Sequence, residues 1–118
     1  MEQMYSLKSA ALLLDIPVRE LMSLCRRSGV SLYTVGDSTK IKAIGLKSLV
    51  ILSASGSAEI SQLLCLTRAA NLLDISTKTL RRLLLSDNIP TYRVGSNIRL
   101  KVSDLALLIK PQKSLYDY

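Results

Sequence analysis

Residues 7–16 have the sequence LKSAALLLDI, and residues 66–75 have the sequence LTRAANLLDI. The two stretches align without a gap at an offset of 59 residues, and the same offset places Tyr33–Gly36 over Tyr92–Gly95. A constant offset held over this distance is typical of an internal repeat. We therefore expect two copies of one small domain, each of about fifty residues. Units of that size bury little core, so contact between the copies or between chains is expected.

Each copy carries the pattern of two short helices followed by a strand hairpin. In the second copy, Thr67 and Ser76 are good N-caps for helices that end at Leu73 and near Asp87. Apolar residues recur in both stretches at spacings of three and four, as in amphipathic helices. A short strand over 92–94, a turn at Gly95 and an alternating return over 98–102 predict the hairpin, and a last helix follows over 105–109.

The first copy follows the same plan, with Ser6 and Pro17 at its helix starts and a final helix near residues 46–52. Between the copies lie small linker residues and then a further helical turn near 59–64. A linker of about nine residues has a typical reach of roughly 15–18 Å, so the sequence allows the two copies to be independent domains joined by a flexible linker. The predicted organisation is a first domain over 1–53, a linker or short helix over 54–62, a second domain over 63–111 and a tail over 112–118.

The predicted fold class is mainly α (α+β), with three short helices and a two-stranded hairpin wing in each domain. The chain of 118 residues has a net charge of +7 and no histidine. The charge is uneven, because residues 1–59 carry +2 and residues 60–118 carry +5. A basic balance of this kind favours a polyanionic partner, although a merely basic protein without such a partner is the simpler alternative.

Several classes of function find little support in the sequence. With no histidine, no paired carboxylates and no glycine-rich phosphate loop, we expect no enzyme, no cofactor and no small-molecule ligand. Cys25 and Cys65 have no partner at metal-ligand spacing, so no metal site is expected. No stretch is long enough to span a bilayer and no signal peptide is evident, which predicts a cytoplasmic, nucleoid-associated protein. The absence of Phe and Trp disfavours binding of single strands by base stacking.

The second predicted helix of each copy is the main candidate for binding. In the second copy, Leu80 and its apolar neighbours mark the buried side, so Lys78 and Arg82 lie opposite on one face. Leu85 points outward on the same face, where a thymine methyl group or a protein partner are both open explanations. The candidate DNA-binding residues of this copy are Thr77, Lys78, Thr79, Arg81 and Arg82 on the helix and Arg93, Asn97, Arg99 and Lys101 on the hairpin.

The first copy offers a different set of residues at the equivalent places. Its candidates are Arg19, Ser23, Arg26 and Arg27 on the helix and Lys40 and Lys42 on the hairpin, where Asp37 opposes them. Arginines on such a helix can bond guanine edges in the major groove, and lysines and threonines can hold phosphates. An ordinary solvated helix face and a solvent-facing hairpin are the simpler alternatives for both copies.

The second copy resembles the excisionase-type, MerR-like winged helix-turn-helix domain. The resemblance rests on the Thr and Ala-Ala start over 66–70, the aliphatic-Ser turn at Ile75-Ser76, the stretch Pro90-Thr91-Tyr92-Arg93-Val94-Gly95 and the return strand with Arg99. It covers nearly all of residues 65–110. It implies a DNA-binding fold with a recognition helix over 77–85 and a wing over 95–99.

The first copy matches that family pattern weakly. It departs from the pattern with Pro17 for the turn serine, Glu20 beside the groove face, Ser31 for Pro90, Thr34 for Arg93 and Gly45 for Asp104. Two alternatives therefore stay open for this copy. It binds DNA in another way, or it mainly holds partners together.

The leading hypothesis is a double-stranded DNA-binding transcriptional regulator that occupies a promoter through its helices and wings. One alternative is an excisionase-like architectural factor in site-specific recombination. The other is a protein-assembly module, such as the small subunit of a viral packaging enzyme. The expected partner is double-stranded DNA, with self-association or a recombinase or polymerase as further possibilities and with no membrane.

Overall fold

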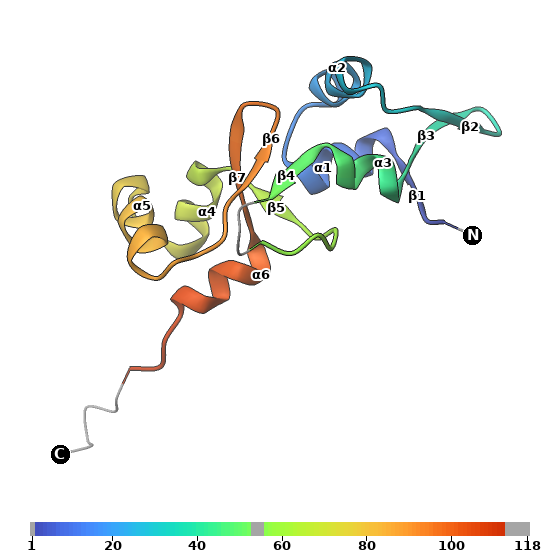
Figure 1. Ribbon diagram of the computed structural model, residues 1–118. Coiled ribbons are helices and arrows are strands. Elements are labelled where there is room, and N and C mark those ends of the chain that lie inside the picture. Colours follow the sequence, from blue (N-terminus) through green and yellow to red (C-terminus); the bar gives the residue numbers. More distant parts are fainter. Residues whose placement is uncertain (1, 53–55, 113–118) are drawn as a thin grey trace.

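The structure is a computed structural model that describes residues 2–52 and 56–112. It has a mixed α+β fold in which short helices pack on two small antiparallel sheets (Figure 1). The predicted tail falls largely on residues 113–118, and the predicted linker partly on 53–55, which lie outside the described residues. The first copy contains β1 (Met4–Ser6), α1 (Leu7–Leu14), α2 (Val18–Ser28), β2 (Tyr33–Val35), β3 (Ser38–Lys42), α3 (Ala43–Ser48) and β4 (Val50–Leu52).

The second copy repeats this order at the offset seen in the sequence. It contains β5 (Leu63–Leu64), α4 (Leu66–Leu73), α5 (Thr77–Ser86), β6 (Tyr92–Val94), β7 (Asn97–Lys101), α6 (Val102–Leu105) and the 3₁₀ helix η1 (Ala106–Leu108). Each helix of the first copy begins 59 residues before its counterpart, and each strand of the first hairpin does the same. The expected internal repeat is therefore confirmed at the level of the backbone.

Repeated residues at the turns explain why the two backbones coincide. Asp15 and Asp74 end α1 and α4 in the left-handed conformation, with φ of 55° and 54°. Gly36 and Gly95 occupy positive φ at the two hairpin turns, where a side chain would be strained. Ser76 caps α5 by accepting the Thr79 N–H at 3.0 Å. Thr67 is not the N-cap that the sequence suggested, because α4 starts one residue earlier and Cys65 holds that position without a side-chain bond.

The two sheets differ in size because a strand of the first copy joins the second sheet. The first sheet has the order β1-β3-β2, and the second has the order β4-β6-β7-β5. Strand β4 pairs with β6, with Val50 opposite Val94 and Leu52 opposite Tyr92. The expected two-stranded hairpins are thus parts of larger sheets. The predicted helix near 46–52 is wrong in its second half, which is β4.

The segment before the second copy is likewise not helical where the structure describes it. Residues 56–62 are irregular, and Leu63–Leu64 form β5. The predicted linker or short helix over 54–62 therefore contains no helix in its described part, and the predicted turn near 59–64 is wrong. The edge of β7 is free to pair at this place, so Leu63 and Leu64 form backbone hydrogen bonds with β7 and not within a helix.

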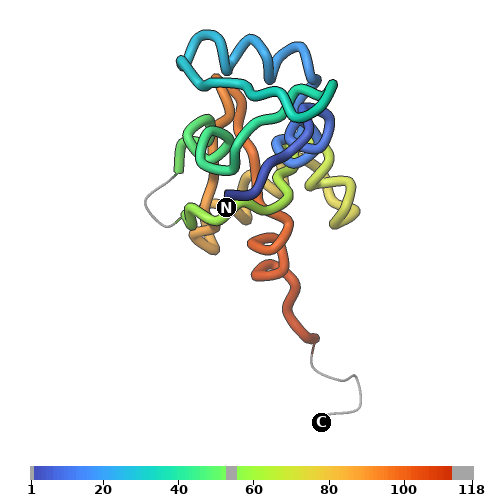
Figure 2. Tube along the Cα trace, turned by 90° about the vertical axis from the view of Figure 1, so that its right-hand side faces the viewer, coloured from blue at the N-terminus to red at the C-terminus, as the bar shows by residue number. Residues whose placement is uncertain are grey.

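The copies share a hydrophobic core instead of standing apart on a flexible tether. Leu63, Tyr92 and Val94 of the second copy are buried in one cluster with Leu21 and Ile41 of the first. The second hairpin reaches up to α2, as two views at right angles show (Figures 1 and 2). The expectation of contact between the copies is confirmed. The copies are not two independent domains joined by a flexible linker, because packing in the shared core fixes their relative position.

Candidate nucleic-acid interface

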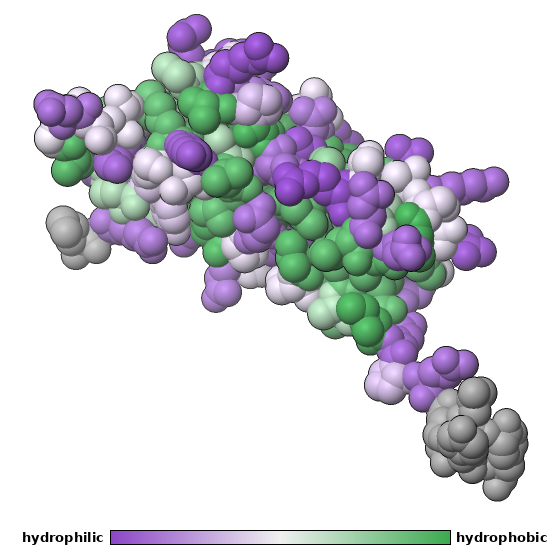
Figure 3. Space-filling model, turned by 180° about the vertical axis from the view of Figure 1, so that it is seen from behind, coloured by the Kyte–Doolittle hydropathy of each residue, from purple (hydrophilic) through white to green (hydrophobic). Residues whose placement is uncertain are grey.

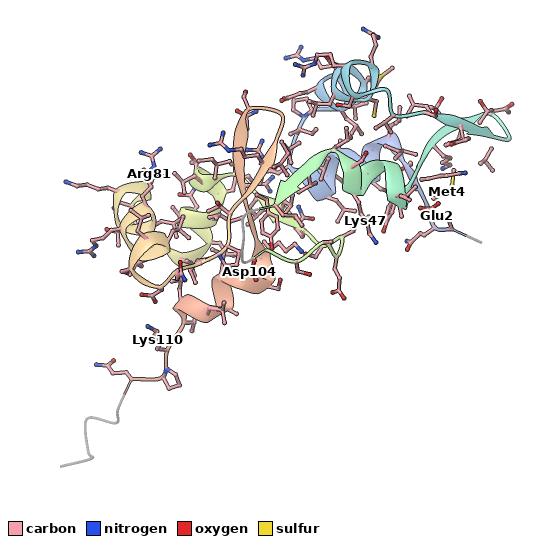
Figure 4. The ribbon with its side chains drawn as sticks, in the orientation of Figure 1. Glu2, Met4, Lys47, Arg81, Asp104 and Lys110 are labelled. Atoms are coloured by element: carbon pink, nitrogen blue, oxygen red, sulfur yellow. The ribbon has the colours of Figure 1, made fainter. Side chains whose placement is uncertain are left out.

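Helix α5 presents its cationic side chains away from the core. Leu80 and Leu84 are buried beneath it, while Lys78, Arg81 and Arg82 are exposed. In Figure 4, Arg81 projects from α5 into open space. Lys78 and Arg82 therefore point away from the core, as the sequence predicts.

A groove runs between α5 and the second hairpin. It is lined by Thr77, Arg81 and Leu85 from α5 and by Asn97 from β7, among others, with a volume of about 690 Å³. Thr77, Arg81 and Leu85 recur every four residues and so share one helix face. Lys78 and Arg82 do not line this groove. The sequence analysis placed Lys78 and Arg82 at the centre of the candidate face. In the structure, Arg81 is the cation of α5 that lies beside the hairpin.

The positive charge of α5 is not neutralised by neighbours. Among residues 2–52 and 56–112, the two ion pairs join Arg68 to Asp15 and Lys110 to Asp87. Neither pair involves a cation of α5. The three cations of this helix therefore keep their full charge for an external partner, as far as the described part of the chain extends.

The charge order along α5 is opposite to the order that stabilises a helix. Lys78 lies in the first turn, which contains no acidic residue. The helix dipole makes a cation unfavourable there by several tenths of a kcal/mol and makes an anion favourable. The start of α5, with Lys78 and Thr77 beside its free N–H groups, is therefore electrostatically suited to a phosphate.

Two of the predicted contact residues on the hairpin are buried. Arg99 is 8% exposed, and its Nε and Nη2 donate to the carbonyl oxygens of Leu14 and Asp15, both at 3.0 Å. Lys101 is 5% exposed, and its Nζ donates to the carbonyl oxygens of Ser57 and Glu59, both at 2.7 Å. Both cations bond backbone carbonyl oxygens of the chain itself, which argues against the prediction that they contact DNA, although Arg99 also lines the groove. Alternation along the strand could not reveal that the first copy covers Arg99 or that residues 57–59 cover Lys101.

The other hairpin candidates stay accessible. Arg93 is exposed on β6. Asn97 is exposed beside the groove, and its Nδ2 donates to Glu20 Oε1 at 3.2 Å. That hydrogen bond ties the tip of the second hairpin to α2. A Cβ added at Gly95 would lie 3.2 Å from Leu24 Cδ2, so the turn itself packs on α2 as well.

The first copy displays its candidates differently. Arg19, Arg26 and Arg27 are exposed on α2, and Ser23 is half-buried. Glu20 lies in the first turn and the two adjacent arginines in the last, which is the charge order that the helix dipole favours. On the hairpin, Lys40 and Lys42 are half-buried, and Lys42 Nζ lies 4.5 Å from the centre of the Tyr33 ring. Charge on this copy is therefore explained in part by the stability of its own elements.

A polar cluster between the copies was missed by the sequence analysis. Asp15 accepts the Cys65 N–H at 2.9 Å and pairs with Arg68. Burial by itself raises the pKa of this carboxyl, but the Cys65 N–H and the Arg68 guanidinium together outweigh burial and leave the pKa below its ordinary value. Gln62 adds a bond from its Nε2 to the Leu12 carbonyl oxygen at 2.6 Å. The Asp repeated at 15 and 74 was the available signal, although it indicated a turn and not an interface.

Comparisons with protein-family models, with curated proteins and with solved structures found no match for this chain. No helix within the described residues is long and apolar enough to cross a lipid bilayer. The same residues contain no group of three side chains able to hold a metal ion.

Proposed function

We propose that this chain binds double-stranded DNA through the second copy, with α5 in the major groove and the hairpin β6–β7 as a wing. In this interpretation both copies are winged helix-turn-helix units, as their sequence pattern predicts. The chain then acts as a transcriptional regulator that occupies a promoter. The observation that carries the proposal is the open groove between α5 and the hairpin, flanked by exposed cations without ion-pair partners in the described chain.

Each group beside the groove suits one part of a duplex. Arg81 has the planar donors that bond a guanine edge in bidentate fashion. Lys78 and Thr77 at the start of α5 suit a phosphate. Arg82 and Arg93 extend the positive surface on either side. If five or six phosphates are neutralised, log K falls with log salt concentration at a slope of about −5.

The first copy is proposed to act chiefly as a platform for the second. Its hydrogen bonds to Arg99 and Asn97 hold the second hairpin against the end of α1 and against α2. The charge order of α2 serves the helix itself. Selection of bound sequences from a random duplex pool is therefore expected to return one half-site and not a related pair.

The selected duplex also supplies the quantitative test. Arg81→Ala is expected to weaken binding by about 1–3 kcal/mol, or roughly 5- to 150-fold, and to relax specificity at one position. Lys78→Ala should weaken binding to all sequences alike and reduce the salt slope by about 1. Fluorescence anisotropy titrations at several salt concentrations measure both effects.

Lys47→Ala is the matched control for these variants. It removes one positive charge from an exposed position on α3, in the other half of the molecule from Arg81 (Figure 4). Its effect on affinity should be small. The proposal fails if the chain binds no duplex at low salt, or if the Lys47 variant weakens binding as much as the Arg81 variant does.

A further inference from the structure

The contact between the two copies uses a different face of each copy. The first copy contributes the end of α1, helix α2 and strand β4, which we call the tail face. The second copy contributes the hairpin β6–β7 and the segment before α4, which we call the head face. Because the two backbones are equivalent, the first copy also possesses a head face and the second copy a tail face. Both of these lie at the ends of the molecule.

The head face of the first copy keeps its apolar residues but leaves them uncovered. Tyr92 and Val94, on the strand that pairs with β4, are 1% and 0% exposed, whereas their counterparts Tyr33 and Val35 are 38% and 55% exposed. Strand β2 pairs with β3 on one side and has no neighbour on its other edge among the described strands. An uncovered strand edge with apolar side chains is a template for pairing with another chain.

The tail face of the second copy is equally open. The counterpart of β4 is the segment Ile109–Pro111, which follows η1. Ile109 has extended backbone angles (φ −91°, ψ 107°) and is 67% exposed, and Leu107 is 60% exposed. Figure 3 shows apolar surface at this place, at the base of the tail. Ile109 thus has an extended backbone, and it is paired with none of the described strands.

Polar groups of the internal contact also recur at the free faces. Gln62, which donates to the end of α1, corresponds to Gln3, and Arg99 corresponds to the cation Lys40. On the other side, Asp15 corresponds to Asp74, which has the same left-handed backbone. The free head face of the first copy therefore has side-chain donors like those of the internal contact. The free tail face of the second copy has an equivalent helix end.

The residues at the close contact between hairpin and helix also recur at the free faces. Gly95 packs against Leu24 in the internal contact. Their counterparts are Gly36, which also has positive φ and open space around its Cβ position, and Leu83, which is half-buried. Glycine and leucine are thus retained at both positions although one pair is not in contact within this chain.

We propose that copies of this chain associate head to tail, with the segment Ile109–Pro111 of one chain paired antiparallel to β2 of the next. Ile109 then lies opposite Val35, as Val50 lies opposite Val94. Such a contact joins two different faces, so it does not close after one step and generates a ring or an open chain.

The contact between chains is weaker than the internal one for two reasons. Pro111 has no N–H to donate, so the paired segment is shorter than β4. The Arg68–Asp15 ion pair is lost as well, because the counterpart of Arg68 is Ser9. Association is therefore reversible and depends on protein concentration.

Two variants that block opposite faces test the proposal by sedimentation equilibrium. Val35→Lys blocks the head face, and Ile109→Lys blocks the tail face. The parent should show a weight-average mass above the monomer value of 13.0 kDa that keeps rising with concentration. Each variant alone should remain monomeric. An equimolar mixture should recover one native contact and form a dimer at twice the monomer mass, but nothing larger.

Ile44→Lys is the matched control, because Ile44 is 65% exposed on α3 and its counterpart Ser103 is also exposed outside the internal contact. It should associate as the parent does. The far-ultraviolet circular dichroism of all three variants should match the parent, since each replaced side chain is exposed. The proposal is overturned if the parent stays monomeric, if it stops at a dimer, if the mixture remains monomeric, or if Ile44→Lys abolishes association.

Discussion

The two copies have the same backbone and opposite surroundings. Helices α2 and α5 start 59 residues apart, yet α2 has an acid in its first turn and arginines in its last, whereas α5 has a lysine in its first turn and no acid. Tyr92 and Val94 of the second hairpin are buried between the copies, whereas Tyr33 and Val35 of the first hairpin are exposed. Residues that shape the backbone are thus repeated, and residues that meet a neighbour have diverged. The difference supports the proposal that the first copy acts as a platform and that the second copy binds DNA.

The largest expected effect tests whether the copies are one folding unit. Leu21→Ala removes a fully buried side chain from the core that the copies share and should lower the free energy of unfolding by about 2–5 kcal/mol. Native-state hydrogen exchange should then show reduced protection in α5 as well as in α2. Unchanged protection of the α5 amides would show that the second copy folds alone. Leu12→Ala, at an exposed position of α1, is the control.

The next effect concerns the cation that binds the end of α1. Arg99→Ala leaves one buried and one half-buried carbonyl oxygen without their donor and should cost about 2–3 kcal/mol in urea unfolding. Lys40→Ala, at the equivalent place in the first copy, should change stability by less than about 0.5 kcal/mol because no neighbour in the described chain depends on it. Equal costs at the two positions would remove the contrast between the copies.

Asp15→Asn should cost about 1 kcal/mol, since the amide accepts the Cys65 N–H less strongly than the carboxylate does and loses the Arg68 pair. The pKa of Asp15 is lowered in the folded protein, so its ionised form stabilises above the unfolded pKa of about 3.9. That contribution is lost as the pH falls through the folded pKa. The stability difference between parent and variant should therefore shrink in acid. Asp74→Asn, at the exposed counterpart, should show neither effect.

The smallest effect separates two equivalent glycines. Gly36→Ala and Gly95→Ala both force a side chain into positive φ, at a cost of about 1 kcal/mol each. Only Gly95 has a neighbour at that Cβ position, because Leu24 Cδ2 lies 3.2 Å away. Thermal unfolding should show that the free energy of unfolding of Gly95→Ala is lower than that of Gly36→Ala by a few tenths of a kcal/mol. A reversed order would contradict the packing of the second hairpin on α2.

Local signals in the sequence predicted most of the individual elements. The caps Ser6 and Ser76 and the strand Tyr92–Val94 all lie where short-range chemistry places them. These features depend on a few neighbouring residues, so a single sequence contains the information. The repeat added strength, because each pattern occurred twice.

The errors arose where distant parts of the chain meet. Val50–Leu52 is apolar enough for a helix or a strand, and only the uncovered edge of β6 decides the matter. Arg99 and Lys101 follow the alternation of an exposed strand, but the first copy and residues 57–59 cover them. The place of Arg81 beside the groove could not be predicted for the same reason, since the position of the hairpin relative to α5 was unknown. None of these contacts has a signal within a short window of sequence.

The strand β4 has a consequence for how the two units depend on protein abundance. Because it belongs to the same polypeptide as the sheet that it completes, it meets β6 at a high effective concentration that dilution of the protein does not change. The internal joint therefore persists in a cell that holds only a few molecules. The proposed pairing between separate chains forms only where the protein concentration is high. The chain therefore combines a permanent strand pairing with one that depends on local protein concentration.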